Sequence, residues 1–201
     1  MFVITLNLVL DRVLLKDILK AIFSTIFFHR LFTCVRPLIP AREILDISYP
    51  CADNAALDAE IEAQIAQLIA ALDTASPPAG PPGQQHQAAR RGGSWFSKVA
   101  AAVNADDDDD GDASCWEKWV INLSVVSPRT ESERARVKRS MESQVAECVF
   151  KIVEIAERRK SHIPPITTAE GDPFAWRLGT IGLETESDET WGRVFKKMLA
   201  E

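Results

Sequence analysis

An aspartate-rich segment of this 201-residue chain has the residue types and the spacing of a known metal site. Acidic residues stand at alternate positions, at Asp106, Asp108 and Asp110. Gly111 follows directly, and Glu117 completes the pattern of an EF-hand calcium loop. In such a loop the carboxylates supply oxygen ligands, the glycine permits a sharp turn and the last glutamate binds through both oxygens. A calcium-responsive binding module is therefore one hypothesis for this chain.

The context of the acidic segment favours a solvated loop without a bound metal. An EF-hand loop leads into a helix, whereas apolar residues alternate over residues 116–126, which is typical of a strand. Ala113 stands where the loop of an EF-hand carries a branched apolar residue. A continuous run of aspartates also satisfies any spaced-aspartate pattern by chance. We expect no metal here.

Other residues that could do chemistry form no recognisable catalytic motif. The three histidines, His29, His86 and His162, are far apart in the sequence. The chain has no nucleophile elbow, P-loop, dinucleotide-binding fingerprint or HExxH motif. The sequence therefore predicts no catalytic residues and no cofactor. A hydrolase of α+β architecture stays open as an alternative, because carboxylates can pair in space without being neighbours in sequence.

The composition describes a folded, mildly acidic protein. Hydrophobic residues make up 46% of the chain, which is enough for a core, and the formal net charge is −6. Six acids lie at residues 106–110 and 112, so the remainder of the chain is formally neutral. A protein that coats nucleic acid needs an excess of Lys and Arg to neutralise phosphates. We therefore expect no nucleic-acid partner.

The cysteines and the N-terminus bear on the compartment. Four cysteines lack any CxxC pair, and no secretory signal precedes them: Cys34, Cys51, Cys115 and Cys148. Reduced thiols in a cytoplasmic protein are the expected state. The apolar N-terminus is interrupted by charges such as Asp11, Lys16 and Lys20, whereas a spanning helix needs roughly 20 apolar residues. The sequence predicts no transmembrane segment.

Hydrophobic periodicity predicts alternating strands and helices. Strands are predicted at residues 2–10, 43–49, 116–126 and 173–185, and helices at 15–27, 57–72, 95–104, 130–160 and 189–199. The first strand is apolar on both faces, so a central position in the sheet is expected. Asp11 is a candidate cap of the first helix, and Asp53 or Asn54 of the second. This order of elements predicts an α+β fold, with helices packed on one face of a small antiparallel sheet.

A long insertion separates the two halves of the predicted domain. Residues 74–94 are rich in Pro, Gly and Gln and have no apolar period, so they cannot bury enough surface to offset their ordering entropy. The acidic segment follows a short apolar stretch. We interpret residues 1–201 as a single domain and residues 74–115 as a long mobile loop insertion.

Two adjacent aromatic residues, Trp95 and Phe96, lie inside this insertion. One interpretation is that they fold back and pack on the domain. The other is an exposed anchor, because aromatic side chains, Trp above all, dominate many protein interfaces. The second interpretation predicts that the two rings bind a partner protein.

The long helix predicted at residues 130–160 begins with a capping box and a basic stretch. Thr130 and Glu133 have the spacing at which each side chain caps the other residue's backbone N–H. Four cations follow: Arg134, Arg136, Lys138 and Arg139. A solvated face is one explanation of such a stretch, and a docking surface is the other.

Three segments together resemble the autophagy-related protein 101 family. They are AIFSTIFFHR, EILDISY and WEKWVINLSVVSPRTESERARVKRSMESQVAECVFKIVEIAERRKSHIPPI. The most specific part is WExW before a strand, then T-E-x-E-R opening a long helix with an IVE segment and a proline pair at its exit. The similarity is collinear over residues 6–49 and 116–166, with a weaker match at PFAWRL.

The resemblance implies a HORMA-like domain and a non-enzymatic adaptor. Members of the family belong to the autophagy-initiating kinase complex, where they pair with the HORMA domain of autophagy-related protein 13 and stabilise it. The implied location is the cytoplasm and the preautophagosomal structure. The calcium-responsive module is the alternative function.

The resemblance also implies two binding sites. Family members carry an exposed Trp-Phe finger that recruits downstream autophagy factors, and Trp95 and Phe96 are its counterpart here. HORMA domains commonly associate through the long central helix, which by fold analogy makes its basic side chains Arg134, Arg136 and Arg139 a candidate heterodimer surface.

Overall fold

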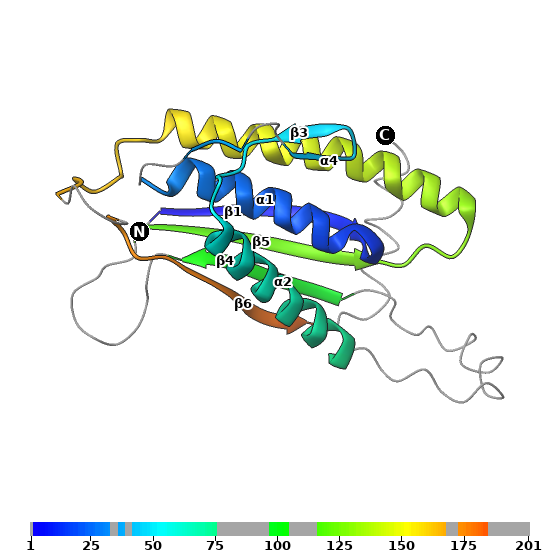
Figure 1. Cartoon of the computed structure of the whole chain (residues 1–201). Helices are drawn as coiled ribbons and strands as arrows, with labels where there is room; N and C mark the ends of the chain where they lie inside the picture. Colours follow the sequence, from blue (N-terminus) through cyan, green and yellow to red (C-terminus); the bar gives the residue numbers. More distant parts are fainter. Residues whose placement is uncertain are drawn as a thin grey trace.

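A four-stranded sheet and three α-helices form the part of the chain that the structure describes (Figure 1). The computed structural model describes residues 2–32, 36–38, 42–75, 97–104, 116–167 and 173–184. The sheet contains, in spatial order, β1 (Phe2–Asp11), β5 (Glu117–Val126), β4 (Ser97–Asn104) and β6 (Arg177–Glu184). The helices are α1 (Leu15–Arg30), α2 (Ala55–Ala75) and α4 (Glu131–Arg158). The predicted α+β class is confirmed.

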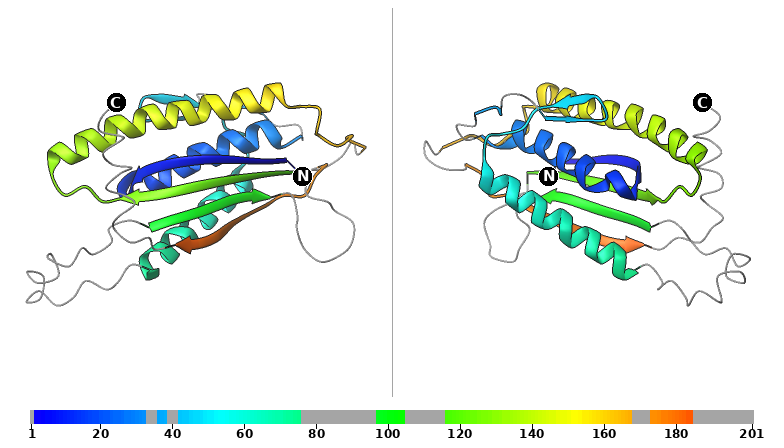
Figure 2. Two further views of the ribbon diagram at one scale, coloured as in Figure 1. Left: turned by 180° about the vertical axis from the view of Figure 1, so that it is seen from behind. Right: turned by 45° about the vertical axis from the view of Figure 1, so that its right-hand side comes forward.

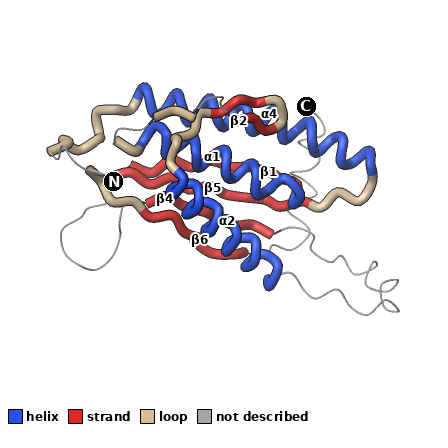
Figure 3. The backbone as a smooth tube through the Cα atoms, viewed as in Figure 1, coloured by secondary structure: helices blue, strands red, loops and turns tan. Residues whose placement is uncertain are grey.

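The helices are arranged in two ways around the sheet. Helices α1 and α2 cover one face, and α4 runs along the β1 edge and packs against α1 (Figures 1 and 2). A small hairpin of β2 (Arg42–Ile44) and β3 (Ile47–Tyr49) lies beside α4 (Figure 3). The core lies between this helical layer and the inner face of the sheet. Among the described residues, no helix has both the length and the apolar character needed to cross a bilayer.

The direction of β1 differs from the predicted antiparallel sheet. Strand β4 pairs antiparallel with β5 and β6, but β1 runs parallel to β5, with Phe2 opposite Glu117 and Asp11 opposite Val126. A parallel pair requires a long crossover connection, and here the chain between the two strands passes through α1 and α2. Apolar alternation cannot reveal strand direction, because it reports only which side chains share a face.

The prediction that the first strand is central is also wrong, because β1 is an edge strand. One face of β1 is buried in the core, through Ile4, Leu6, Leu8 and Leu10. On the opposite face Val3 is 47% exposed. The residue types misled the prediction, since a valine fits a half-buried surface as well as a core.

The free edge of β1 is covered by side chains of α4. The backbone N–H of Val9 donates to Gln144 Oε1 over 3.1 Å, and that of Asp11 lies 3.0 Å from Met141 Sδ. Unpaired strand edges invite association with other chains unless something covers them. Helix α4 therefore closes this edge and leaves its own opposite side to solvent.

Of the two predicted helix caps, Asn54 caps α2, whereas Asp11 caps a short turn before α1, and Leu14 at the N-cap of α1 makes no side-chain cap hydrogen bond. Asp11 caps a short 3-10 turn (Arg12–Leu14) that leads into α1, its carboxylate accepting from the Val13 N–H at 3.0 Å. Asn54 accepts from the Leu57 N–H at 3.1 Å at the start of α2. Each cap satisfies a backbone donor that has no partner within its helix.

The capping box of α4 is confirmed as well. Thr130 Oγ1 accepts from the Glu133 N–H at 3.2 Å, and Glu133 Oε2 accepts from the Thr130 N–H at 3.1 Å. The helix then buries one stripe of side chains, at Val137, Met141, Val145, Cys148, Val149, Ile152 and Ala156. The stripe repeats every three or four residues, so the opposite side of α4 faces away from the core.

The single strand predicted at residues 43–49 is instead the β2–β3 hairpin. Ile44 pairs with Ile47, and the two residues between them have positive φ, 50° for Leu45 and 59° for Asp46. This backbone is typical of the tight two-residue turns that join antiparallel strands. The sequence lacks the usual Asn-Gly or Asp-Gly signal, so the turn could not be distinguished from a continuous strand.

The short helix predicted at residues 95–104 is wrong: residues Ser97–Asn104 form β4, between β5 and β6. The predicted insertion at residues 74–115 therefore includes a strand of the sheet. The segment is rich in Ala and Val, which fit both elements, and pairing with two neighbours decides between them. Trp95, Phe96, the acidic run at residues 106–112 and the predicted helix at 189–199 lie outside the described residues.

Candidate functional site

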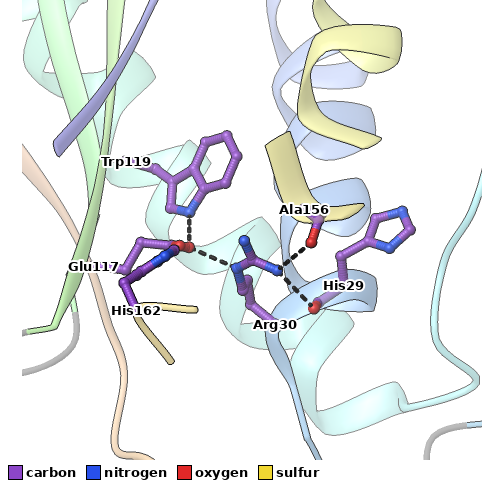
Figure 4. A network of polar contacts seen from close by, with 6 residues as sticks. All are labelled: His29, Arg30, Glu117, Trp119, Ala156 and His162. Carbon is purple, nitrogen blue, oxygen red and sulfur yellow. Dashed lines mark hydrogen bonds and ion pairs between the residues drawn. The ribbon is translucent and has the colours of Figure 1, made fainter. Parts of the chain in front are cut away.

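The WExW segment builds a buried polar network at one end of the sheet (Figure 4). Glu117, the first residue of β5, is only 4% exposed. Its Oε1 accepts from Arg30 Nε at 2.7 Å and from the indole N–H of Trp119. Its Oε2 lies 2.6 Å from His162 Nε2. Glu117 and Trp119 are two positions apart on one strand, so both side chains point to the same face.

This network overturns the calcium hypothesis at Glu117. Both carboxylate oxygens have partners inside the protein, so they are not placed to bind a metal together. The other three carboxylates of the pattern, Asp106, Asp108 and Asp110, lie outside the described residues. The strand at β5 also occupies the place where an EF-hand needs a helix.

Arg30 joins three elements at this end of the molecule. Besides Glu117, its guanidinium donates from Nη1 to the carbonyl oxygens of His29 and Ala156, each at 3.4 Å. It therefore ties the end of α1 to the end of α4 and the start of β5 (Figure 4). The side chains of Arg30 and Glu117 are 9% and 3% exposed. A buried charge pair of this kind is costly to break from one side, so its role is to hold the fold.

Aromatic rings surround the network. Trp116 lies 5.5 Å from the ring of His162 and 5.2 Å from that of Phe174, measured between centroids. Phe2 contacts His162 at 4.9 Å, and the guanidinium carbon of Arg159 lies 4.7 Å from the Phe2 centroid. The rings shield the Glu117 contacts from water, which strengthens them. Sequence reasoning missed the pairing of Glu117 with Arg30.

Two titratable groups, Cys148 and His29, have pKa values shifted toward their neutral forms. Burial raises the pKa of the Cys148 thiol to about 12, so the thiol is protonated and unreactive. Burial, aided by the charge of Arg30, lowers the pKa of His29. Neither group lies in a recognisable catalytic arrangement with its neighbours.

The largest exposed aromatic surface among the described residues is on α4. Phe150 is 73% exposed and lies on the side of the helix opposite the buried stripe. We call this side the outward face and define it by helical periodicity as Arg136, Arg139, Ser143, Ala146, Phe150, Glu154 and Glu157. A large exposed ring on a rigid helix, flanked by charged residues, has the composition of a protein-binding surface.

The structure separates the three arginines of the predicted heterodimer surface. Arg136 and Arg139 lie on the outward face, within the helical turns that lead to Phe150. Arg134 is exposed too, but it lies on the same side of the helix as the buried Met141 and Val145. Sequence reasoning missed Phe150, although it stands next to the periodic apolar position at Val149.

The predicted finger is outside the described residues, but its position in the chain is informative. Trp95 and Phe96 immediately precede β4, whose first residue, Ser97, lies opposite Val125 of β5. The network around Glu117 is at the other end of β5. The chain therefore enters the sheet directly after the two aromatic residues, at the end of the sheet where β5 leads into α4.

Comparison with known proteins gives matches to one family. The family model described as "Autophagy-related protein 101" matches residues 7–170. A protein named autophagy-related protein 101 from Arabidopsis thaliana is 23% identical, in an alignment covering 92% of this chain and 88% of the relative. One of the same name from Schizosaccharomyces pombe is 26% identical, covering 98% of this chain and 95% of the relative.

Proposed function

Since the chain belongs to the autophagy-related protein 101 family, a non-catalytic family of autophagy initiation, we propose that it is a HORMA-type adaptor. In this role it pairs with the HORMA domain of autophagy-related protein 13, stabilises it and connects the autophagy-initiating kinase complex to downstream factors. The mixed sheet with helices on one face and the long α4 is compatible with such a domain. The preautophagosomal structure and the cytoplasm are its proposed locations.

The observation that supports pairing most strongly is the outward face of α4. Phe150 stands exposed on a helix whose other side is fixed by the core and by the β1 edge. Because α4 packs against α1 and β1, its backbone is already in place before a partner binds. We propose that Phe150, Arg136 and Arg139 form the heterodimer surface. Arg134, on the other side, contributes less.

The second proposed site is the aromatic finger. Trp95 and Phe96 are joined to β4 without a spacer, so a partner that binds them is held at the end of the sheet. That position is far along β5 from the Glu117 network. The finger precedes β4, whereas the proposed heterodimer surface is on α4. One chain can therefore hold autophagy-related protein 13 and a downstream factor together.

Co-purification with the HORMA domain of autophagy-related protein 13 tests this proposal. The wild-type chain should recover the partner and the kinase complex from cells of the source organism. Trp95→Ala with Phe96→Ala should keep this partner and lose the downstream factors, with autophagic flux blocked. A clear fall in the melting temperature of that double variant would show that the two rings belong to the core instead, because a buried ring costs about 3–5 kcal/mol on truncation.

Two charge-reversal variants on opposite sides of α4 test the proposed heterodimer surface. Arg139→Glu should reduce recovery of the HORMA partner, whereas Arg134→Glu on the same helix should leave it close to wild type. Equal recovery of the partner by all α4 variants would rule out this surface while leaving family membership intact.

A further inference from the structure

A small cavity lies beside the Glu117 network, between the end of α1 and the residues that lead into β6. Its volume is about 40 Å³. Half of its lining residues are aromatic: Phe27, Trp116, Trp119, Phe174 and Trp176. These rings pack on one another, with 5.2 Å between the centroids of Trp116 and Phe174 and 4.6 Å between those of Phe27 and Trp176. Arg30 and Glu117 are the charged members of this lining.

Two buried N–H groups of this lining have no acceptor among the described residues: Nη2 of Arg30 and Nε1 of Trp116. The other nitrogens of the guanidinium are engaged, Nε with Glu117 and Nη1 with two backbone carbonyls. The Arg30 side chain is only 9% exposed, so bulk water does not reach it freely. Buried donors in folded proteins almost always have a partner, and an ordered water supplies it where the protein does not. The two donors therefore indicate a ligand that accepts hydrogen bonds.

Size and charge decide which ligand the cavity can hold. A water molecule needs at least about 10–15 Å³ of such space, whereas pockets for organic ligands measure about 300–1,000 Å³. The cavity of about 40 Å³ therefore admits water and excludes an organic ligand. An anion such as chloride would suit the two donors, but the Glu117 carboxylate already neutralises Arg30 at 2.7 Å. A second negative charge beside that carboxylate would be repelled strongly, because the apolar surroundings screen it little. The ligand is therefore neutral.

We propose that an ordered water molecule occupies this cavity and accepts hydrogen bonds from Arg30 Nη2 and Trp116 Nε1. Two polar partners are enough to hold a buried water, and the carboxylate of Glu117 in the same lining can accept one of its hydrogens. The water connects the end of α1 to the residue before β5, beside the segment that leads into β6. It is a part of the folded structure that exchanges slowly with solvent.

A crystal structure of the wild-type chain at a resolution that shows ordered water tests this directly. One oxygen atom should lie within about 3.2 Å of both nitrogens. A second crystal soaked in bromide separates a water from an anion, since bromide gives anomalous scattering and water does not. An anomalous peak between the two nitrogens, or a cavity without density there, would overturn the proposal.

Water–protein NMR measures the same site in solution, with a matched control inside the network. The indole N–H of Trp116 should show a nuclear Overhauser effect to water, of the sign that a long-lived bound water gives. The indole N–H of Trp119 donates to Glu117, so its effect should be much weaker. Trp116→Phe keeps an aromatic ring in the wall and identifies the Trp116 signal by its disappearance. A Trp116 indole without a water signal, or a signal from Trp119 that is equally strong, would contradict the proposed site. Neither experiment involves a partner protein, so both are independent of the proposed function.

Discussion

The Glu117 network and the outward face of α4 use the same residue types in opposite surroundings. Each combines arginine, glutamate and an aromatic ring. At the network, Arg30 and Glu117 are almost fully buried and have specific partners, whereas on α4 Phe150 is 73% exposed. Buried charges that satisfy each other hold the fold together, while exposed charges around a free ring are available to another protein. Burial, rather than residue type, therefore distinguishes a structural motif from a binding surface here.

The largest expected effect is at the network. Glu117→Ala should lower the free energy of unfolding by about 3–5 kcal/mol, because it leaves the buried Arg30 guanidinium without its carboxylate. Chemical denaturation of the variant measures this directly. The control is Glu147→Ala on the solvent side of α4, which should change the free energy by less than about 0.5 kcal/mol. Similar results for the two variants would remove the distinction between the regions.

Two neighbouring residues of α4, one buried and one exposed, should differ in how much they contribute to stability. Val149 is 6% exposed and Phe150 is 73% exposed. Val149→Ala should cost about 1–3 kcal/mol of stability, as truncation in a packed core does. Phe150→Ala should leave stability within about 0.5 kcal/mol of wild type, despite removing the larger side chain. Thermal melts of both variants check this; a large loss in Phe150→Ala would place that ring in the core.

The start of α4 should show a smaller effect. Thr130→Ala removes the side chain that accepts from the Glu133 N–H, which should cost about 1 kcal/mol. Thr130→Ser keeps the hydroxyl and should retain most of the stability. Urea denaturation distinguishes the two variants. If Thr130→Ser were as unstable as Thr130→Ala, the capping hydrogen bond would not be the cause.

The smallest expected effect is the contribution of His29 to the pH dependence of stability. Its pKa is lowered in the folded protein by burial and by the neighbouring charge of Arg30. The unfolded chain therefore binds a proton more readily, and stability should decrease as the pH falls through the unfolded value near 6.5. His29→Gln cannot titrate and should flatten this part of the stability profile. An unchanged profile in that variant would show that other groups dominate.

The local features of the fold were predictable because neighbouring residues encode them. The cap at Asn54 and the box at Thr130 and Glu133 depend on side chains a few positions apart, and the structure confirms them. The features that depend on distant partners were not predictable. The parallel direction of β1 and the strand at Ser97–Asn104 are decided by pairing across the sheet.

The candidate sites, too, were predictable only where they depend on residues close together in the sequence. The sequence indicated a basic stretch on the long helix, but only the helix orientation separates Arg134 from Arg139. Phe150 stands beside a periodic apolar position, so its exposure becomes evident only once the buried stripe is known. Glu117 matched a calcium pattern by spacing, while its actual partners, Arg30 and His162, are far away in sequence.

Calorimetric titration of the HORMA domain of autophagy-related protein 13 into three forms of this chain tests whether the outward face of α4 binds this partner. We expect tight binding by wild type and by Arg134→Glu. For Phe150→Ala we expect a loss of about 2 kcal/mol or more in binding free energy, as for an anchor residue at the centre of an interface. Equal affinity for Phe150→Ala and wild type would contradict the assignment of the outward face as the partner-binding surface.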